Sequence, residues 1–175
     1  MDWHDAGWRF YEQTLPDGDD RLSAVPIEWQ RELAALAILD QQMNNGAYLQ
    51  FLANFGRTAY VLSHQALQKI GAYRMVEIIE SCQTMIDEHF PTDGRPLREL
   101  GQLMINEVIG REGNTVKEAG SVLPEEVIAR IYELSYEYMS YPDPVWNLAQ
   151  SHYGQRIEAW AARFFPTKPW WRFWS

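Results

Sequence analysis

Acidic side chains are the residues of this chain whose spacing could do chemistry, and they gather on two predicted helices. On a helix over residues 73–90, drawn at about 100° per residue, one half is apolar and the other half is acidic. Its four acids are Glu77, Glu80, Asp87 and Glu88. They fall within an arc of about 100°, at two levels about 12–15 Å apart along the axis.

A second predicted helix, over residues 124–141, carries a similar polar stripe of Glu126, Arg130, Glu133 and Glu137. Glu133 and Glu137 form an i, i+4 pair of like charge, which costs a few tenths of a kcal/mol and therefore suggests a use. One interpretation of both stripes is a solvated face. The other is a rigid array of carboxylates in place of backbone phosphates, for which spacings of about 5–11 Å are suitable.

The side chains of a conventional active site are scattered. The four histidines are His4, His64, His89 and His152, and no two of them form a His-x-x-x-His pair. Glu-x-x-His is also absent, so the sequence has neither the zinc-protease nor the di-iron motif. Cys82 lies on an apolar helix face, which indicates a buried, inert thiol. The glycine-rich and serine motifs of nucleotide-binding folds and hydrolases are also missing. The sequence predicts no catalytic residue, metal or cofactor, although two carboxylates that meet only in the fold stay possible.

Two amides, Gln50 and Asn54, follow an Asn45–Gly46 step at helical i, i+4 spacing. Neither is an acid, a base, a nucleophile or a good metal ligand. We therefore interpret the pair as part of a structural corner, in which the amides bond each other or hold the 45–46 turn. The alternative is contact with a ligand or a peptide, because amides recognise backbone groups well.

Helical periodicity dominates the elements that position these residues, and no stretch alternates as a strand would. Helices are predicted over 3–14, 27–44, 47–54, 59–70, 73–90, 97–109, 124–141 and, in one or two pieces, 144–163. We expect Asn45 or Gly46 to end one helix in a left-handed cap, and Gly56 and Gly71 to end two others. The predicted fold is an all-α single domain over 1–175, with about six to eight helices and short loops.

The chain has 175 residues and a net charge of −9. Residues 77–143 carry −9, whereas 1–76 carry −3 and 144–175 carry +3. Such a field repels nucleic acid and attracts basic partners, although solubility alone would also explain it. The absence of a signal sequence and of an apolar span, together with a single cysteine, predicts a cytoplasmic protein.

Aromatic residues are abundant, with eight Trp, nine Tyr and seven Phe. Their density over residues 130–160 is typical of interfaces and compatible with a homodimer. The segment 164–175 ends in a cluster of Trp170, Trp171, Phe173 and Trp174, beside Lys168 and Arg172. This tail either folds back over the helical core or forms an exposed patch that binds a partner or a membrane surface.

The corner also carries a family pattern: Asn45, Gly46, Tyr48, Gln50, Phe51 and Asn54, followed by a helix that ends in Ile70-Gly71-Ala72. With these residues, the segment 40–82 resembles the core of a bacterial family of helical proteins, long catalogued as a domain of unknown function. Its best-known member is a dimeric mimic of double-stranded DNA that captures a transcriptional repressor. The family has a second glycine where this chain has Ala47. The resemblance implies a core over about 27–163, an N-terminal extension over 1–26 and the tail over 164–175.

Charge and resemblance together predict a non-enzymatic, acidic protein-binding module. It would act as a DNA mimic in the nucleic-acid site of a basic DNA-binding protein or transcription factor, without binding nucleic acid itself. The predicted contact residues are Glu77, Glu80, Asp87, Glu88, Glu126, Glu133 and Glu137. One alternative is an immunity or antitoxin-like protein that neutralises a specific partner through its aromatic surface. Another is an enzyme with a carboxylate-lined cleft.

Overall fold

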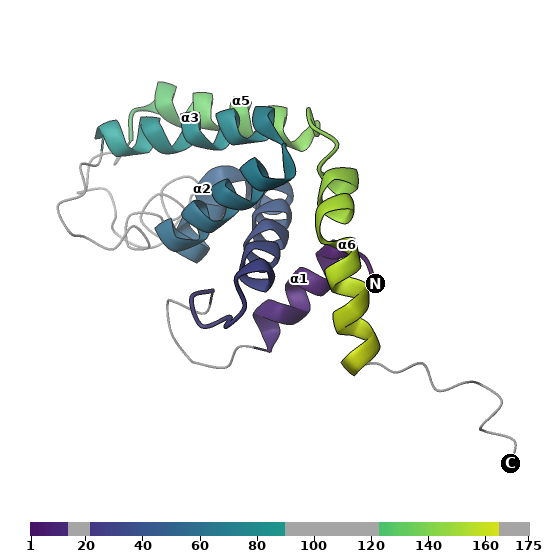
Figure 1. The fold of residues 1–175 in the computed structure, drawn as a ribbon. Coiled ribbons are helices and arrows are strands. Elements are labelled where there is room, and N and C mark those ends of the chain that lie inside the picture. Colours follow the sequence, from purple (N-terminus) through teal and green to yellow (C-terminus); the bar gives the residue numbers. More distant parts are fainter. Residues whose placement is uncertain (14–21, 90–122, 165–175) are drawn as a thin grey trace, which may run out of the picture.

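The computed structural model describes residues 1–13, 22–89 and 123–164, and these residues form five helices and no strand (Figure 1). The helices are α1 (Trp3–Glu12), α2 (Glu28–Ile70), α3 (Tyr73–His89), α5 (Glu125–Met139) and α6 (Val145–Phe164). The all-α prediction is confirmed. The predicted count of six to eight is too high for the described residues, because two predicted helix ends are kinks inside α2. The predicted helix 97–109, most of the loop 15–26 and the tail beyond Phe164 lie outside the described residues.

Helix α2 is the centre of the fold and contacts each of the other four helices. Helices α3 and α5 pack against each other along one side of it, and α1 and α6 pack against each other along another (Figure 1). Within the first pair, α3 and α5 run antiparallel and side by side. The molecule is therefore two helix pairs joined by a long, bent central helix.

The first part of α2 is buried on all sides, so that every residue over 32–40 is buried. A helix enclosed in this way has to be apolar all round, and the stretch Leu33–Leu39 is entirely apolar. Helix α1 approaches this part of α2 closely, because a Cβ on Gly7 would lie 2.6 Å from the Leu33 carbonyl oxygen. Phe10 of α1 makes edge-to-face ring contacts with Trp29 and Trp160. The predicted N-terminal extension thus includes a helix that is part of the core.

The corner of α2 differs from the prediction. The left-handed residue is Ala47, with φ 67° and ψ −174°, rather than Asn45 or Gly46. Gly46 has φ −165° and needs no glycine for its backbone, but a Cβ there would lie 1.7 Å from the Gln50 side-chain oxygen. A side chain at position 46 would therefore displace the Gln50 amide from its present position. The other predicted breaks are confirmed, since Gly56 kinks the helix at φ 68° and Gly71 caps it at φ 82°.

A buried acid, Asp40, joins three parts of the fold. Its carboxylate accepts a hydrogen bond from the Tyr141 hydroxyl at 2.9 Å and lies 3.7 Å from Nε2 of His4 in α1. Asn44 donates to the Tyr141 oxygen at 2.9 Å and to the Asp40 carbonyl at 2.8 Å. Burial raises the pKa of Asp40, and the hydrogen bond from Tyr141 and the coulombic interaction with His4 oppose that effect only in part.

We expect Ala47→Gly to raise the free energy of unfolding by about 1 kcal/mol. A residue with a Cβ in this backbone conformation costs about 1–3 kcal/mol. Glycine loses more chain entropy than alanine on folding, by about 0.5–1 kcal/mol. Urea unfolding followed by circular dichroism would measure the change. A loss of stability would mean that the buried Ala47 methyl outweighs the strain.

Gly56 is the matched position, because its φ and ψ nearly equal those of Ala47 and an added Cβ would meet no heavy atom within 4 Å. The reverse substitution, Gly56→Ala, should therefore lower the free energy of unfolding by about 1–2 kcal/mol through the backbone alone. Changes of the same sign at the two positions would contradict this account.

The raised pKa of Asp40 predicts a pH-dependent difference between the protein and its Asp40→Asn variant. A group whose pKa is higher in the folded state than its ordinary value of about 3.9 favours folding most when protonated. This contribution is lost as the pH rises from about 4 through the folded pKa, whereas asparagine does not titrate. The stability of Asp40→Asn relative to the parent should therefore increase from acidic to neutral pH in urea unfolding. A difference that stayed constant across that range would show that burial does not shift the Asp40 pKa.

Candidate functional site on the α3–α5 face

A carboxylate pair does line a hollow in the described part of the structure, between the two ends of α2 and helix α6. This hollow of about 490 Å³ is lined by Ile27, Glu28, Trp29, Glu32, Lys69, His152 and Arg156. Lys69 donates to both Glu28, at 2.9 Å, and Glu32. The hydrogen bond from Lys69 lowers the pKa of Glu28, which is the wrong direction for a general acid. The pair therefore forms an ion-pair cluster, and its geometry does not support the enzyme alternative.

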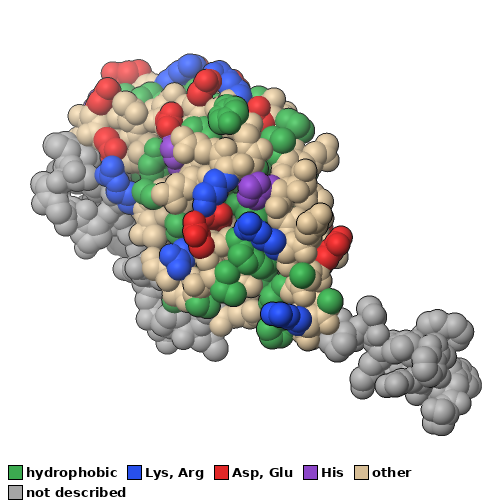
Figure 2. Space-filling model, viewed as in Figure 1, with side chains coloured by type: hydrophobic (Ala, Val, Ile, Leu, Met, Phe, Trp, Pro, Cys, Tyr) green, Lys and Arg blue, Asp and Glu red, His purple; other side chains and the backbone are tan. Residues whose placement is uncertain are grey.

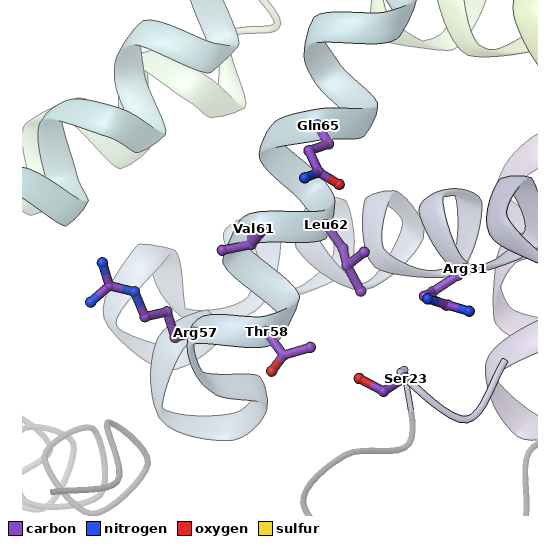
Figure 3. A pocket seen from close by; sticks show the side chains of 7 residues that line it. All are labelled: Ser23, Arg31, Arg57, Thr58, Val61, Leu62 and Gln65. Carbon is purple, nitrogen blue, oxygen red and sulfur yellow. The ribbon is translucent and has the colours of Figure 1, made fainter. Parts of the chain in front are cut away.

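A second hollow, of about 380 Å³, is lined by no carboxylate of the described residues (Figure 3). Elsewhere in the described residues, no group of three or more His, Cys, Asp or Glu side chains comes together to hold a metal. Burial raises the pKa of the Cys82 thiol to about 12, so the thiolate is scarce at neutral pH. Because none of these features of the described residues supports a catalytic or metal site, the acidic helices are the main candidate for a functional surface.

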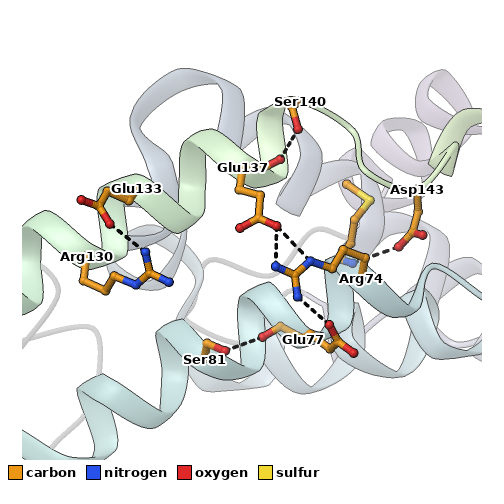
Figure 4. Close-up of polar contacts among 9 residues, drawn as sticks. Arg74, Glu77, Ser81, Arg130, Glu133, Glu137, Ser140 and Asp143 are labelled. Carbon is orange, nitrogen blue, oxygen red and sulfur yellow. Dashed lines mark hydrogen bonds and ion pairs between the residues drawn. The ribbon is translucent and has the colours of Figure 1, made fainter.

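Helices α3 and α5 are joined on their solvent side by Arg74 (Figure 4). Its guanidinium donates to Glu137 through Nε at 2.9 Å and through Nη2 at 2.5 Å, and to Glu77 through Nη1 at 2.7 Å. The start of α3 therefore lies beside the end of α5, and the two acidic stripes run in opposite directions next to each other. The α3 N-terminus is also capped from the α5–α6 connection, since Asp143 accepts the Met75 N–H at 3.0 Å.

Five of the seven predicted acids line this contact on its solvent side. At about 100° per residue, Glu88 projects within about 40° of Arg74 on α3, and Glu126 and Glu133 project within about 40° of Glu137 on α5. We call Glu77, Glu88, Glu126, Glu133 and Glu137 the acidic seam. Figure 2 shows acidic and basic side chains together along the edge where α3 and α5 lie.

The acidic seam is neutralised at one end more than at the other. Arg74 binds two of its acids, and Arg130 binds Glu133 at 2.7 Å. Glu88 and Glu126 are exposed and have no basic partner among the described residues. Within residues 77–89 and 123–143 there are nine acids and one arginine. Among the described residues, the seam acids without a basic partner therefore lie where α3 ends and α5 begins.

Glu80 and Asp87 do not belong to the seam, because they project from the opposite flank of α3 toward the last part of α2. Glu80 lies 2.5 Å from Nε2 of His64, and Asp87 lies 3.5 Å from Nη1 of Arg57. The predicted stripe of four acids on α3 is thus divided between two surfaces. Acids spread over an arc of about 100° on one helix can face a different neighbouring helix on each side.

Tyr48 of the family motif positions both acidic helices. Its backbone N–H donates to Oγ of Ser135 in α5 at 3.2 Å, and its hydroxyl donates to Oε1 of Gln83 in α3 at 2.8 Å. Gln83 in turn donates to Asp87 at 2.8 Å. Complete burial raises the pKa of Tyr48 well above its ordinary value, so the hydroxyl keeps its proton and remains a donor.

The remaining motif residues surround the corner. The Gln42 side-chain oxygen, before the corner, accepts hydrogen bonds from Gln50 at 3.1 Å and Asn54 at 2.8 Å, both after it. Phe51 is buried against the Tyr48 ring, and Asn45 is exposed. The two amides therefore bond across the bend to Gln42 and not to each other.

Three residues of this framework were not predicted from the sequence: Gln42, Gln83 and Ser135. The signal for the last two was present: each is polar and lies on the apolar face of its helix, where a buried polar side chain needs a partner. Gln42 carried no such mark, because it follows a charged residue and another glutamine.

Comparisons with known proteins agree with the motif. A family model described as DMP19-like protein matches residues 24–165, which include α2, α3, α5 and α6 but not α1. No curated protein and no solved structure matches the chain. None of the described helices has the length and apolar composition that crossing a membrane requires.

We expect Tyr48→Phe to lower the free energy of unfolding by about 1–3 kcal/mol, because it leaves the buried Gln83 oxygen without its donor. The matched control is Tyr60→Phe, since the Tyr60 hydroxyl makes no hydrogen bond among the described residues. That change should stay within about 0.5 kcal/mol. Hydrogen exchange should also show faster opening of α3 in Tyr48→Phe alone. Equal losses in the two variants would exclude a positioning role for the Tyr48 hydroxyl.

Proposed function

The chain belongs to the DMP19-like protein family, the DNA-mimic-like family that its 45–54 motif resembles, and on this premise we propose that it binds a basic DNA-binding protein in place of DNA. In this proposal it is a non-enzymatic protein whose contact surface is the acidic seam. It acts in the cytoplasm and binds no nucleic acid directly, because its field repels phosphates.

The arrangement of carboxylates on two packed helices is the observation that carries the proposal. From Glu77 to Glu88, and from Glu126 to Glu137, each helix presents acids over about 16 Å. This length corresponds to roughly five base-pair steps of duplex DNA. Because α3 and α5 lie side by side, the seam offers two neighbouring rows of negative charge, as a duplex offers two strands.

The arginines of the seam support the proposal by fixing its carboxylates. Arg74 holds Glu77 and Glu137, and Arg130 holds Glu133, through charge-assisted bonds of 2.5–2.9 Å. With both arginines counted, five glutamates leave a net charge of −3. Glutamate side chains that are already held in place lose less conformational entropy on binding than mobile glutamate side chains would. A homodimer would present two such seams.

A second function, neutralisation of one specific partner by an immunity or antitoxin-like protein, is favoured by exposed aromatic residues. Tyr73 and Tyr136 are 66% and 67% exposed and lie next in sequence to Arg74 and Glu137 at one end of the seam. Tyrosines are common hot spots of protein interfaces. The tail tryptophans that first suggested this function lie outside the described residues. A complex formed mainly by aromatic contacts would resist salt, which separates the two functions.

To test the proposal, the immobilised chain is exposed to a bacterial lysate at low salt and washed at moderate salt, and the released proteins are identified by mass. We expect a DNA-binding protein that salt releases and that an excess of duplex DNA displaces from the chain. A partner retained through moderate salt and indifferent to DNA would overturn the proposal in favour of neutralisation.

The variant Glu88→Gln/Glu126→Gln tests the seam against its captured partner. Removing two exposed charges should weaken binding about tenfold at low salt and reduce the salt dependence. The control Glu12→Gln/Glu158→Gln makes the same change in net charge, from −9 to −7, at exposed acids of α1 and α6. Equal weakening by the two double variants would show that overall charge, rather than the seam, attracts the partner.

A further inference from the structure

The hollow beside the second kink of α2 is not part of the acidic surface, and its chemistry is the reverse. It lies between the chain segment that leads into α2 and the last part of α2, after Gly56 (Figure 3). Its lining consists of Ser23, Arg31, Arg57, Thr58, Val61, Leu62 and Gln65. We call it the arginine hollow. Among the described residues, this lining holds two arginines and no acid, in a chain whose net charge is −9.

The polar groups of the arginine hollow are largely uncommitted. The side chains of Ser23, Thr58 and Gln65 make no hydrogen bond among the described residues. Arg31 uses only its Nε, which donates to the Val25 carbonyl at 3.0 Å and so fixes the plane of the guanidinium. Both of its Nη groups remain available as donors. A guanidinium held in this way is suited to bidentate recognition of a carboxylate or a phosphate.

Arg57 forms the outer rim of the hollow. Its guanidinium points away from the centre in Figure 3 and lies 3.5 Å from Asp87 of α3, longer than a charge-assisted hydrogen bond. This loose pair leaves Arg57 able to turn toward a negative ligand. Asp87 is the acid nearest to the rim in the described contacts. A hydrogen bond donated by Gln83, which is also in α3, orients the Asp87 side chain.

Size and apolar surface indicate the rest of the ligand. A volume of about 380 Å³ is within the range of small-molecule sites. Val61 and Leu62 supply apolar contact next to the donors. The polar groups of the carboxylate-lined hollow, in contrast, already bond one another, since Lys69 donates to both Glu28 and Glu32.

From these observations we propose that the arginine hollow binds a small organic oxyanion, a carboxylate or phosphate group carried on an apolar body. The anionic group lies against the Nη groups of Arg31, with the Ser23 and Thr58 hydroxyls and the Gln65 amide as further donors. The apolar body covers Val61 and Leu62. This site is independent of the acidic seam, and its occupation does not require the proposed function to hold.

Isothermal titration calorimetry and amide NMR of the full chain, at constant ionic strength, test this site with three probes: phenyl phosphate, benzoate and benzyl alcohol. Phenyl phosphate or benzoate should bind saturably, one per chain, in the millimolar range and should shift the amides of Thr58, Leu62 and Gln65. The stronger of the two identifies the anionic group. Benzyl alcohol, which has the ring without the charge, should not saturate. Failure of both anions to saturate by tens of millimolar would overturn the proposal.

Three variants separate this site from general attraction of anions. Arg31→Lys keeps the charge but loses the planar fork, and should weaken binding about tenfold. Thr58→Val removes one donor at an exposed helical position and should weaken binding about threefold without affecting the fold. Arg156→Gln removes an exposed arginine of the other hollow and should leave binding unchanged. Loss of binding in Arg156→Gln, or unchanged binding in both Arg31→Lys and Thr58→Val, would place the anion elsewhere and overturn the proposal.

Discussion

The bend of α2 at Gly46 and Ala47 is the constraint on which the rest of the structure depends. It brings Tyr48 to a point where its backbone bonds α5 and its hydroxyl bonds α3. Without the bend, the Tyr48 N–H would be committed to the preceding helical turn and could not reach Ser135. One residue with two buried hydrogen bonds thus connects the central helix to both acidic helices and helps to fix where they lie.

The bend itself is stabilised by contacts on both sides of it. Ala47 has a backbone conformation that a residue with a Cβ rarely adopts. Gln42 accepts from Gln50 and Asn54 across the bend, and the Gln50 amide lies where a side chain at position 46 would be. Such a conformation persists only where its surroundings over-determine it. The dense set of motif residues around the corner provides those surroundings.

Much of this fold could be predicted from the sequence, because helical periodicity and glycine breaks are local signals. The bounds of α3, the kink at Gly56 and the cap at Gly71 followed from them. The left-handed residue did not, since the corner depends on contacts across the bend, such as those of Gln42 with Gln50 and Asn54, which a propensity argument does not include. The division of the α3 acids was also out of reach. It depends on which helices lie on the two flanks of α3, and Glu80 and Asp87 meet His64 and Arg57 only after α2 has bent twice.

The framework and the charges of this protein are encoded by different residues, and this separation governs what family membership implies for function. The motif residues build the corner and position α3 and α5, but none of them is an acid of the seam. A related chain can therefore keep the complete motif, and the same two helices, while presenting another set of side chains on their solvent side. What this chain presents is five glutamates with two arginines among them.

Because Arg74 bridges the two helices, it also adds to the packing between them. Charge placement and helix packing are thus coupled at one end of the seam and independent at the other, where Glu88 and Glu126 have no basic partner in the described residues. The second end is therefore the place where the charge of the surface can change at least cost to the fold.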